Sequence, residues 1–411
     1  MGDPVARTGR SRQVSAVVLA LLVPLGALTV AGLVLLWPSQ PPPTIESGDL
    51  VTGTVVAVRD CPDLPAEQCR QAEVTITSGP DEGRLFVAAA PAGVGAPEVV
   101  AGDRVVLQSN LDAPASQRYV IGDFQRGPVL WVLAGVFAIA VVVLARWRGV
   151  AALVGLVASL GVLLLFVLPA LLAGSPPLWV ATVGASAIAF LTMVLAHGPS
   201  LRTGVALLGV LVSLLLTAGL GAVVIELGSF TGLAEESSAF LQAFGAQVDP
   251  RGLLLAGLVI GALGVLDDVT ITQTAAVAEV HAADPWQSRR RLLRAGLRVG
   301  RDHVAATVNT LVLAYAGAAL PLLMLFLLSG STLGQVLTGE LVAQEVIRTL
   351  VGAIGIVAAV PLTTVLAAAL LATESGYPGP SSPAAQAGAP DGEPTSHAPS
   401  GEPDHRAQRP Y

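Results

Sequence analysis

Two adjacent aspartates, Asp267 and Asp268, stand inside the apolar stretch GALGVLDDVTITQ. The surrounding run is long enough to cross a bilayer, whose core of about 30 Å needs about 20 apolar residues of helix. A carboxylate at the centre of such a span costs about 2.5–3.5 kcal/mol on translocon scales and usually faces a bundle interior or a water-filled cavity. Neighbouring carboxylates repel in a low dielectric, so at least one is expected to hold a proton near neutral pH. The pair therefore predicts a proton or ion relay.

The helix that carries the pair is expected to turn one face of small and polar residues toward its neighbours. At 3.6 residues per turn, the residues close to one line are Gly257, Gly261, Gly264, Asp268, Thr272, Ala275 and Glu279. Gly257 and Gly261 form a small-xxx-small pair that lets helices approach closely. We therefore expect this face, with Asp268 and Thr272, to pack into the bundle, and Asp267 to point about 100° away. The alternative is that both acids lie near the cytoplasmic end of the helix, where they are solvated or paired with arginines.

The next apolar segment offers candidate helpers for the pair in DHVAATVNTLVLAYAG. Asn309 lies deep in this segment and needs a hydrogen-bond partner, and Thr310 follows it. Polar contacts between membrane helices often contribute only about 0.6 kcal/mol. For Asn309 the sequence leaves two interpretations open, a functional helper or a structural contact between helices.

The composition predicts a multi-pass membrane protein. Of the 411 residues 53% are hydrophobic and only 12% are charged, with a mean hydropathy of +0.71, whereas soluble proteins average about 25% charged residues. The predicted fold class is an all-α polytopic bundle of about eight transmembrane helices with a small extracytoplasmic β domain. The expected spans are 14–37, 128–146, 149–173, 177–196, 203–227, 252–278, 304–329 and 346–372.

Arginine placement predicts the orientation. The positive-inside tendency places the amino-terminal segment 1–13 in the cytoplasm, the first span 14–37 as an uncleaved anchor, and both termini inside the plasma membrane. The alternative is a cleaved signal peptide, but the apolar run here is longer than a typical signal core and no clear cleavage site follows it. A membrane domain of seven helices then covers 128–372, and the tail 373–411, rich in Pro, Gly, Ser and Ala, is expected to be disordered.

The polar segment 38–127 reads as a small outer β domain, because five short runs rich in Val, Ile and Thr are bounded by Gly, Pro and Asp. Five strands suit a barrel of the OB type, and a sandwich-like sheet is the alternative. Cys61 and Cys69 are the only cysteines; an outer location favours a disulfide between them, with two free thiols as the alternative. This domain is the candidate surface for a protein partner.

The loop 279–303 contains DPWQSRRRLLRAGLRVGRDH. Apolar residues on one side and arginines on the others predict an amphipathic helix lying along the inner membrane surface. Its candidate contacts with lipid head groups are Arg289, Arg290, Arg291, Arg294 and Arg298.

Several long motifs resemble the YibE/F family of bacterial membrane proteins, especially its actinobacterial-type members: GDFQRGPVLWVLAGVFAIAVVVLARWRG, LAHG, GALGVLDDVTITQTAAVAEV, GRDHVAATVNTLVLAYAGAALP and RTLVGAIGIVAAVPLTT. The resemblance runs from about residue 48 to residue 372 and implies a multi-pass plasma membrane protein with one outer domain. A fainter likeness, over a quarter of the chain, is to SecD, SecF and the resistance-nodulation-division transporters, and it implies proton-coupled work. The chain departs from that group with two extra spans and a smaller outer domain.

Two functional classes follow. The first is a transporter or proton-coupled export component, and the second is a non-catalytic scaffold or assembly factor whose outer domain binds a partner. We do not expect an enzyme, because neighbouring acids on one helix face a common site poorly and no nucleophile stands beside a histidine. No phosphate loop, dinucleotide fingerprint or metal-ligand spacing is present, so we expect no cofactor or metal. Because no long basic run occurs outside one loop, we also expect no nucleic-acid binding. The oligomeric state and the substrate are left open.

Overall fold

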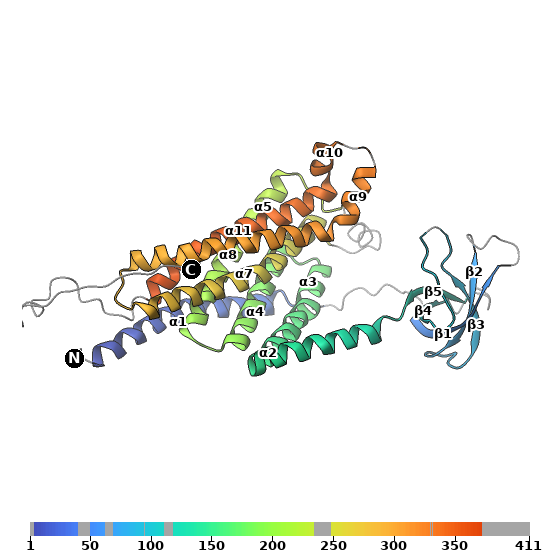
Figure 1. Cartoon of the computed structure of the whole chain (residues 1–411), viewed down its shortest axis with the longest axis horizontal. Coiled ribbons are helices and arrows are strands. Elements are labelled where there is room, and N and C mark those ends of the chain that lie inside the picture. The colour runs from blue at the N-terminus through green and yellow to red at the C-terminus, as the bar shows by residue number, and fades with distance from the viewer. Residues whose placement is uncertain are drawn as a thin grey trace, which may run out of the picture.

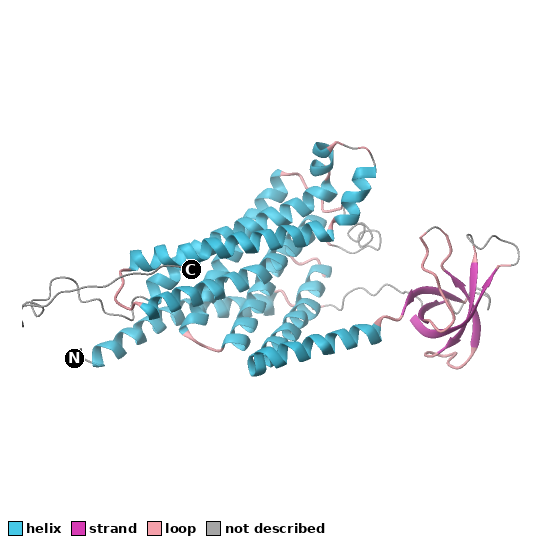
Figure 2. Cartoon of the chain, in the orientation of Figure 1, coloured by secondary structure: helices cyan, strands magenta, loops and turns pink. Residues whose placement is uncertain are grey.

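The computed structural model describes residues 4–39, 50–61, 69–93, 95–110, 118–233, 248–328, 330 and 332–371. A long helical bundle and a small β domain make up this part of the chain (Figure 2). They are joined through the first part of one helix, and the N-terminus lies at the end of the bundle away from the β domain (Figure 1). The predicted disordered tail, 373–411, lies outside the described residues.

The bundle is built mainly from long helices (Figure 1), and most of them are apolar. Their bounds are α1 Pro4–Leu35, α2 Gly127–Val162, the π-helical turn η1 Leu163–Val167, α3 Leu168–Leu172, α4 Pro177–His197, α5 Leu201–Leu227, α7 Pro250–Ala283, α8 Arg289–Ala318, α9 Leu320–Leu328, α10 Leu333–Thr338 and α11 Glu340–Leu371.

Six described helical segments are long and apolar enough to cross a membrane, and a seventh is counted if α8 and α9, which are bent by 59° at their junction, form one span. The segment Gly127–Leu172 has 46 residues, about 69 Å of helix and therefore twice the thickness of a bilayer core. It is interrupted at Arg146, whose φ of 54° and ψ of −131° are not helical. The chain is a multi-helix membrane protein, and this break falls at the last residue of the span expected at 128–146, just before the span expected at 149–173.

The chain folds back on itself at Arg146. A Cβ on Gly149 would lie 2.5 Å from the carbonyl oxygen of Val141, although eight residues of straight helix rise about 12 Å. Figure 1 shows the two halves of α2 as a V, with the first half leading from the β domain. We call this first half, residues 127–145, the arm.

The β domain is a closed five-stranded barrel with the strand order β1-β2-β3-β5-β4. The strands are β1 Leu50–Asp60, β2 Arg70–Ile76, β3 Leu85–Ala90, β4 Arg104–Ser109 and β5 Tyr119–Phe124. β3 and β5 run parallel and pair at Ala89 and Val120, whereas the other pairs are antiparallel. Inward-facing side chains alternate along β1 and β2, as a one-sided core requires. This is the barrel of the OB type, so the sandwich alternative is wrong.

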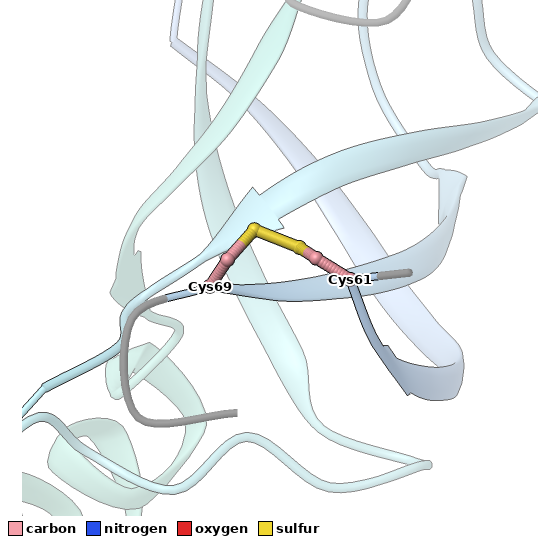
Figure 3. The surroundings of a disulfide bond; sticks show 2 residues. All are labelled: Cys61 and Cys69. Carbon is pink, nitrogen blue, oxygen red and sulfur yellow. A yellow bond between two sulfur atoms is a disulfide. The ribbon is translucent and has the colours of Figure 1, made fainter. Parts of the chain in front are cut away.

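Two features close the ends of the barrel strands. The hydroxyl of the buried Tyr119 donates to Asp81 at 2.8 Å, and Arg84 donates to the same carboxylate at 2.9 Å. Cys61 and Cys69, at the end of β1 and just before β2, form a disulfide with Cα atoms 5.7 Å apart (Figure 3). This is the pairing that the sequence favoured.

The arginine-rich segment does not form a separate helix along the membrane surface. It is the first half of α8, which continues without a break to Ala318. One side of it is buried against protein, since Leu292, Gly296 and Gly300 pack toward α7 and α11. The expectation of a surface-lying helix was therefore wrong. Its five candidate lipid-contacting arginines, Arg289, Arg290, Arg291, Arg294 and Arg298, are nevertheless exposed.

Candidate functional site

The aspartate pair lies on α7, the central helix of the bundle. Asp249 caps its start by accepting a hydrogen bond from the backbone N–H of Arg251 at 3.1 Å, and Pro250 occupies the first turn, where its fixed φ suits a helix. α7 contacts α4, α5, α8 and α11. Its 34 residues rise about 51 Å, so the pair, near the middle of α7, lies far from either end.

Asp267 points toward α4 and is half-buried. Thr192 of α4 donates its hydroxyl to Oδ2 of Asp267 at 3.4 Å, while the same hydroxyl lies 2.9 Å from the carbonyl oxygen of Ile188. The other oxygen, Oδ1, is buried and has no hydrogen-bond partner. A buried carboxylate oxygen without a partner is costly in its charged form, so this site favours a carboxyl that gains a proton or a bound ion.

Asp268 faces the other way and is exposed, with Thr272 one turn further along. The hydroxyl of Thr272 donates to the backbone carbonyl of Asp268 rather than to its carboxylate. The glycines expected to pack this face into the bundle do not do so: Gly257, Gly261 and Gly264 are exposed.

A Cβ at Gly257 or Gly264 would meet no atom within 4 Å, and one at Gly261 would meet only the Tyr315 hydroxyl at 3.2 Å. The prediction that this face is buried was therefore wrong. We call the exposed line Gly257, Gly261, Gly264 and Asp268 the glycine face of α7.

The expected helpers on α8 are not brought to the pair. Asn309 and Thr310 are both exposed, so neither side chain is packed against the half-buried Asp267. Thr310 donates to the carbonyl oxygen of Ala306 on its own helix at 3.0 Å. In the described part of the chain, no hydrogen bond links either residue to Asp267 or Asp268.

The polar contact that ties α7 to its neighbours lies instead at Gln273. This side chain is only 2% exposed and donates to the carbonyl oxygen of Gly296 on α8 at 2.9 Å and to the hydroxyl of Thr364 on α11 at 2.7 Å. Gly296 and Gly300 provide the close approach, because a Cβ at Gly300 would lie 2.4 Å from Val360 and 2.8 Å from Gln273. The four-residue spacing of these two glycines was a signal in the sequence, masked by the arginines around it.

A cavity of about 270 Å³ opens beside the Gly257 end of the glycine face. Its walls include Leu168, Ile260 and Gly257, and Gln344 and Arg348 of α11 supply its polar side. Arg348 also pairs with Glu345 at 2.6 Å. Gly257 therefore connects this cavity to the line of residues that leads to Asp268, eleven residues or about 16 Å away along the helix.

The family model of YibE/F-like proteins matches residues 133–373, more than half of the chain. The chain belongs to the YibE/F-like family. The YibE/F match begins within the arm and ends after α11, so it contains the aspartate pair, the glycine face and the Gln273 contact but not the barrel. The comparisons with curated proteins and with solved structures gave no match.

Proposed function

We propose that this YibE/F-like protein is a transporter or proton-coupled export component of the plasma membrane, with both termini in the cytoplasm. Asp267 is the group that accepts and releases the proton, and Asp268 is its neighbour on the open side of α7. The observation that carries the proposal is the carboxylate of Asp267, held mid-helix in a membrane span with one oxygen weakly bonded and the other buried without a partner. Intramembrane acids of this kind mark ion and proton pathways.

The two carboxylates offer access from different sides. Asp267 contacts α4, and Asp268 is exposed about 100° around the helix. Because neighbouring acids disfavour a second negative charge, loss of a proton from one promotes retention by the other. This coupling gives the pair a means of passing a proton from the interior of the bundle to the glycine face.

Proton flux tests the proposal. Purified protein in liposomes with an internal pH dye, under an imposed voltage, should acidify the lumen, and Asp267→Asn should abolish this flux while Asp268→Asn should reduce it. Asp302→Asn, an exposed acid on α8, is the matched control and should keep wild-type flux. Wild-type protein without flux, or full flux in Asp267→Asn, would contradict the proposal, and a folded but silent wild type would favour the scaffold alternative.

A further inference from the structure

The arm is a span without a partner. From residue 127 to residue 145 every position is exposed except Ala138, Val141 and Val142, which are half-buried. The other long helices of the bundle each bury a face against a neighbour. Small residues that allow close packing, rather than hydrophobicity, hold membrane helices together. The close glycine contact that the described chain gives the arm lies at its last turn, where Gly149 meets Val141 and Ala145.

The glycine face of α7 is the complementary feature. It is a central helix surface with room for a neighbour, because Gly257 and Gly264 have no atom near their Cβ positions. It also exposes the carboxylate of Asp268 in the middle of a span, and the free-energy cost of an acid facing lipid falls when a covering helix brings a polar or charged partner to it. The same chain thus has one helix without a partner and one face without a cover.

The two features match in spacing. The branched residues Val132, Val136, Ile139 and Val143 lie along one line of the arm and are 67%, 59%, 66% and 75% exposed. Their intervals of four, three and four residues are those of Gly257, Gly261, Gly264 and Asp268. The arm and α7 both begin on the side of the barrel and run in the same direction (Figure 1). Four bulky side chains can therefore meet three glycines and the aspartate level by level.

Charge supports the same alignment. Arg146 directly follows the arm, three residues or about 4.5 Å of helix rise beyond Val143, and its side chain is exposed. In this alignment the guanidinium approaches Asp268 from the inner side. An arginine beside an intramembrane carboxylate is the kind of pairing by which such charges are usually satisfied.

We propose that the chain forms a two-fold dimer in which the arm of each copy lies along the glycine face of the other copy. Such an interface is self-complementary, as a two-fold dimer requires, and it covers both unpartnered surfaces at once. The barrel at the outer end of each arm is thereby placed over the partner copy. The dimer does not depend on proton transport.

Cysteine cross-linking in membranes tests this arrangement, because the chain has only two cysteines and they are joined as a disulfide. Two differently tagged copies are co-expressed, one with Ile139→Cys and the other with Gly264→Cys, and a membrane-permeant oxidant is added. The dimer predicts a product carrying both tags. Both positions tolerate the change, since Ile139 is exposed and a Cβ at Gly264 meets no neighbour.

The controls fix the register and the partner. Ile139→Cys with Gly257→Cys, displaced by seven residues or about 10 Å, should give a weaker product. So should Ile139→Cys with Ile354→Cys, an exposed position fourteen residues from the start of α11, as Gly264 is from the start of α7. Three results would each overturn the dimer. The first is an equal yield for all pairs, and the second is the absence of a mixed-tag product although a lipid-soluble maleimide labels both thiols. The third is cross-linking only within a single chain that carries both cysteines.

Discussion

Replacing Gly300 by leucine should loosen the contact that joins α7, α8 and α11. The Cβ of any new side chain would lie 2.4 Å from Val360 and 2.8 Å from Gln273, so α8 must move outward. Overpacking of this kind costs about 1–3 kcal/mol. Displacing Gln273 also weakens its two hydrogen bonds, at about 0.6 kcal/mol each for membrane helices. We therefore expect Gly300→Leu to lower the free energy of unfolding by about 2–4 kcal/mol relative to a glycine-to-leucine change that meets no neighbour.

The assay is equilibrium unfolding in mixed micelles of increasing SDS content, followed by circular dichroism. Gly317→Leu is the matched control, because it lies on the same helix and a Cβ there meets no atom within 4 Å. Both variants gain up to about 1 kcal/mol of helix propensity on losing a glycine, so the difference between them isolates the packing cost. Equal unfolding free energies for Gly300→Leu and Gly317→Leu would refute the proposed role of this contact.

Three further predictions concern the membrane site and the barrel. Thr192→Val should slow proton flux about threefold at most, because its 3.4 Å bond to Asp267 is long and such bonds average about 0.6 kcal/mol; Thr192→Ser should restore the flux in the liposome assay. The Tyr119 hydroxyl lowers the pKa of Asp81, so this contribution to barrel stability is present above about pH 4 and lost below it. Burial, and next the hydrogen bond to Asp81, raises the pKa of Tyr119, so barrel stability also falls above about pH 10. Urea unfolding midpoints measured across pH should show both the acid and the alkaline loss of stability, and Tyr119→Phe should reduce both losses. Replacing Cys61 and Cys69 by serine should lower barrel stability by about 2–3 kcal/mol, the value for so short a loop, and an unchanged urea midpoint would contradict this.

The barrel could be predicted from the sequence because its strands carry a local signal. Val, Ile and Thr runs bounded by turn residues gave five strands, and the compartment argument gave the Cys61–Cys69 disulfide. The closing pair between β3 and β5, at Ala89 and Val120, joins segments about thirty residues apart and has no local signature.

The face of α7 could not be predicted, for a reason specific to membranes. Helical periodicity shows that Gly257, Gly261, Gly264 and Asp268 share a face, but it does not show which neighbour covers that face. In water an apolar face must be buried, whereas in lipid apolar faces are stable whether they meet protein or acyl chains. The buried side of α7 is marked instead by Gln273, whose two hydrogen-bond partners on other helices could not be read from its own position.

Infrared spectroscopy can show whether Asp267 carries a proton within the membrane bundle, because the carbonyl stretch of a protonated carboxyl is distinct from that of a carboxylate. The measurement compares spectra of the protein in lipid at neutral and alkaline pH. If Asp267 is the proton carrier, the wild type should show a protonated-carboxyl band at neutral pH that disappears at alkaline pH. The band should be absent from Asp267→Asn and should persist in Asp268→Asn. The same band in Asp267→Asn as in the wild type would contradict this role.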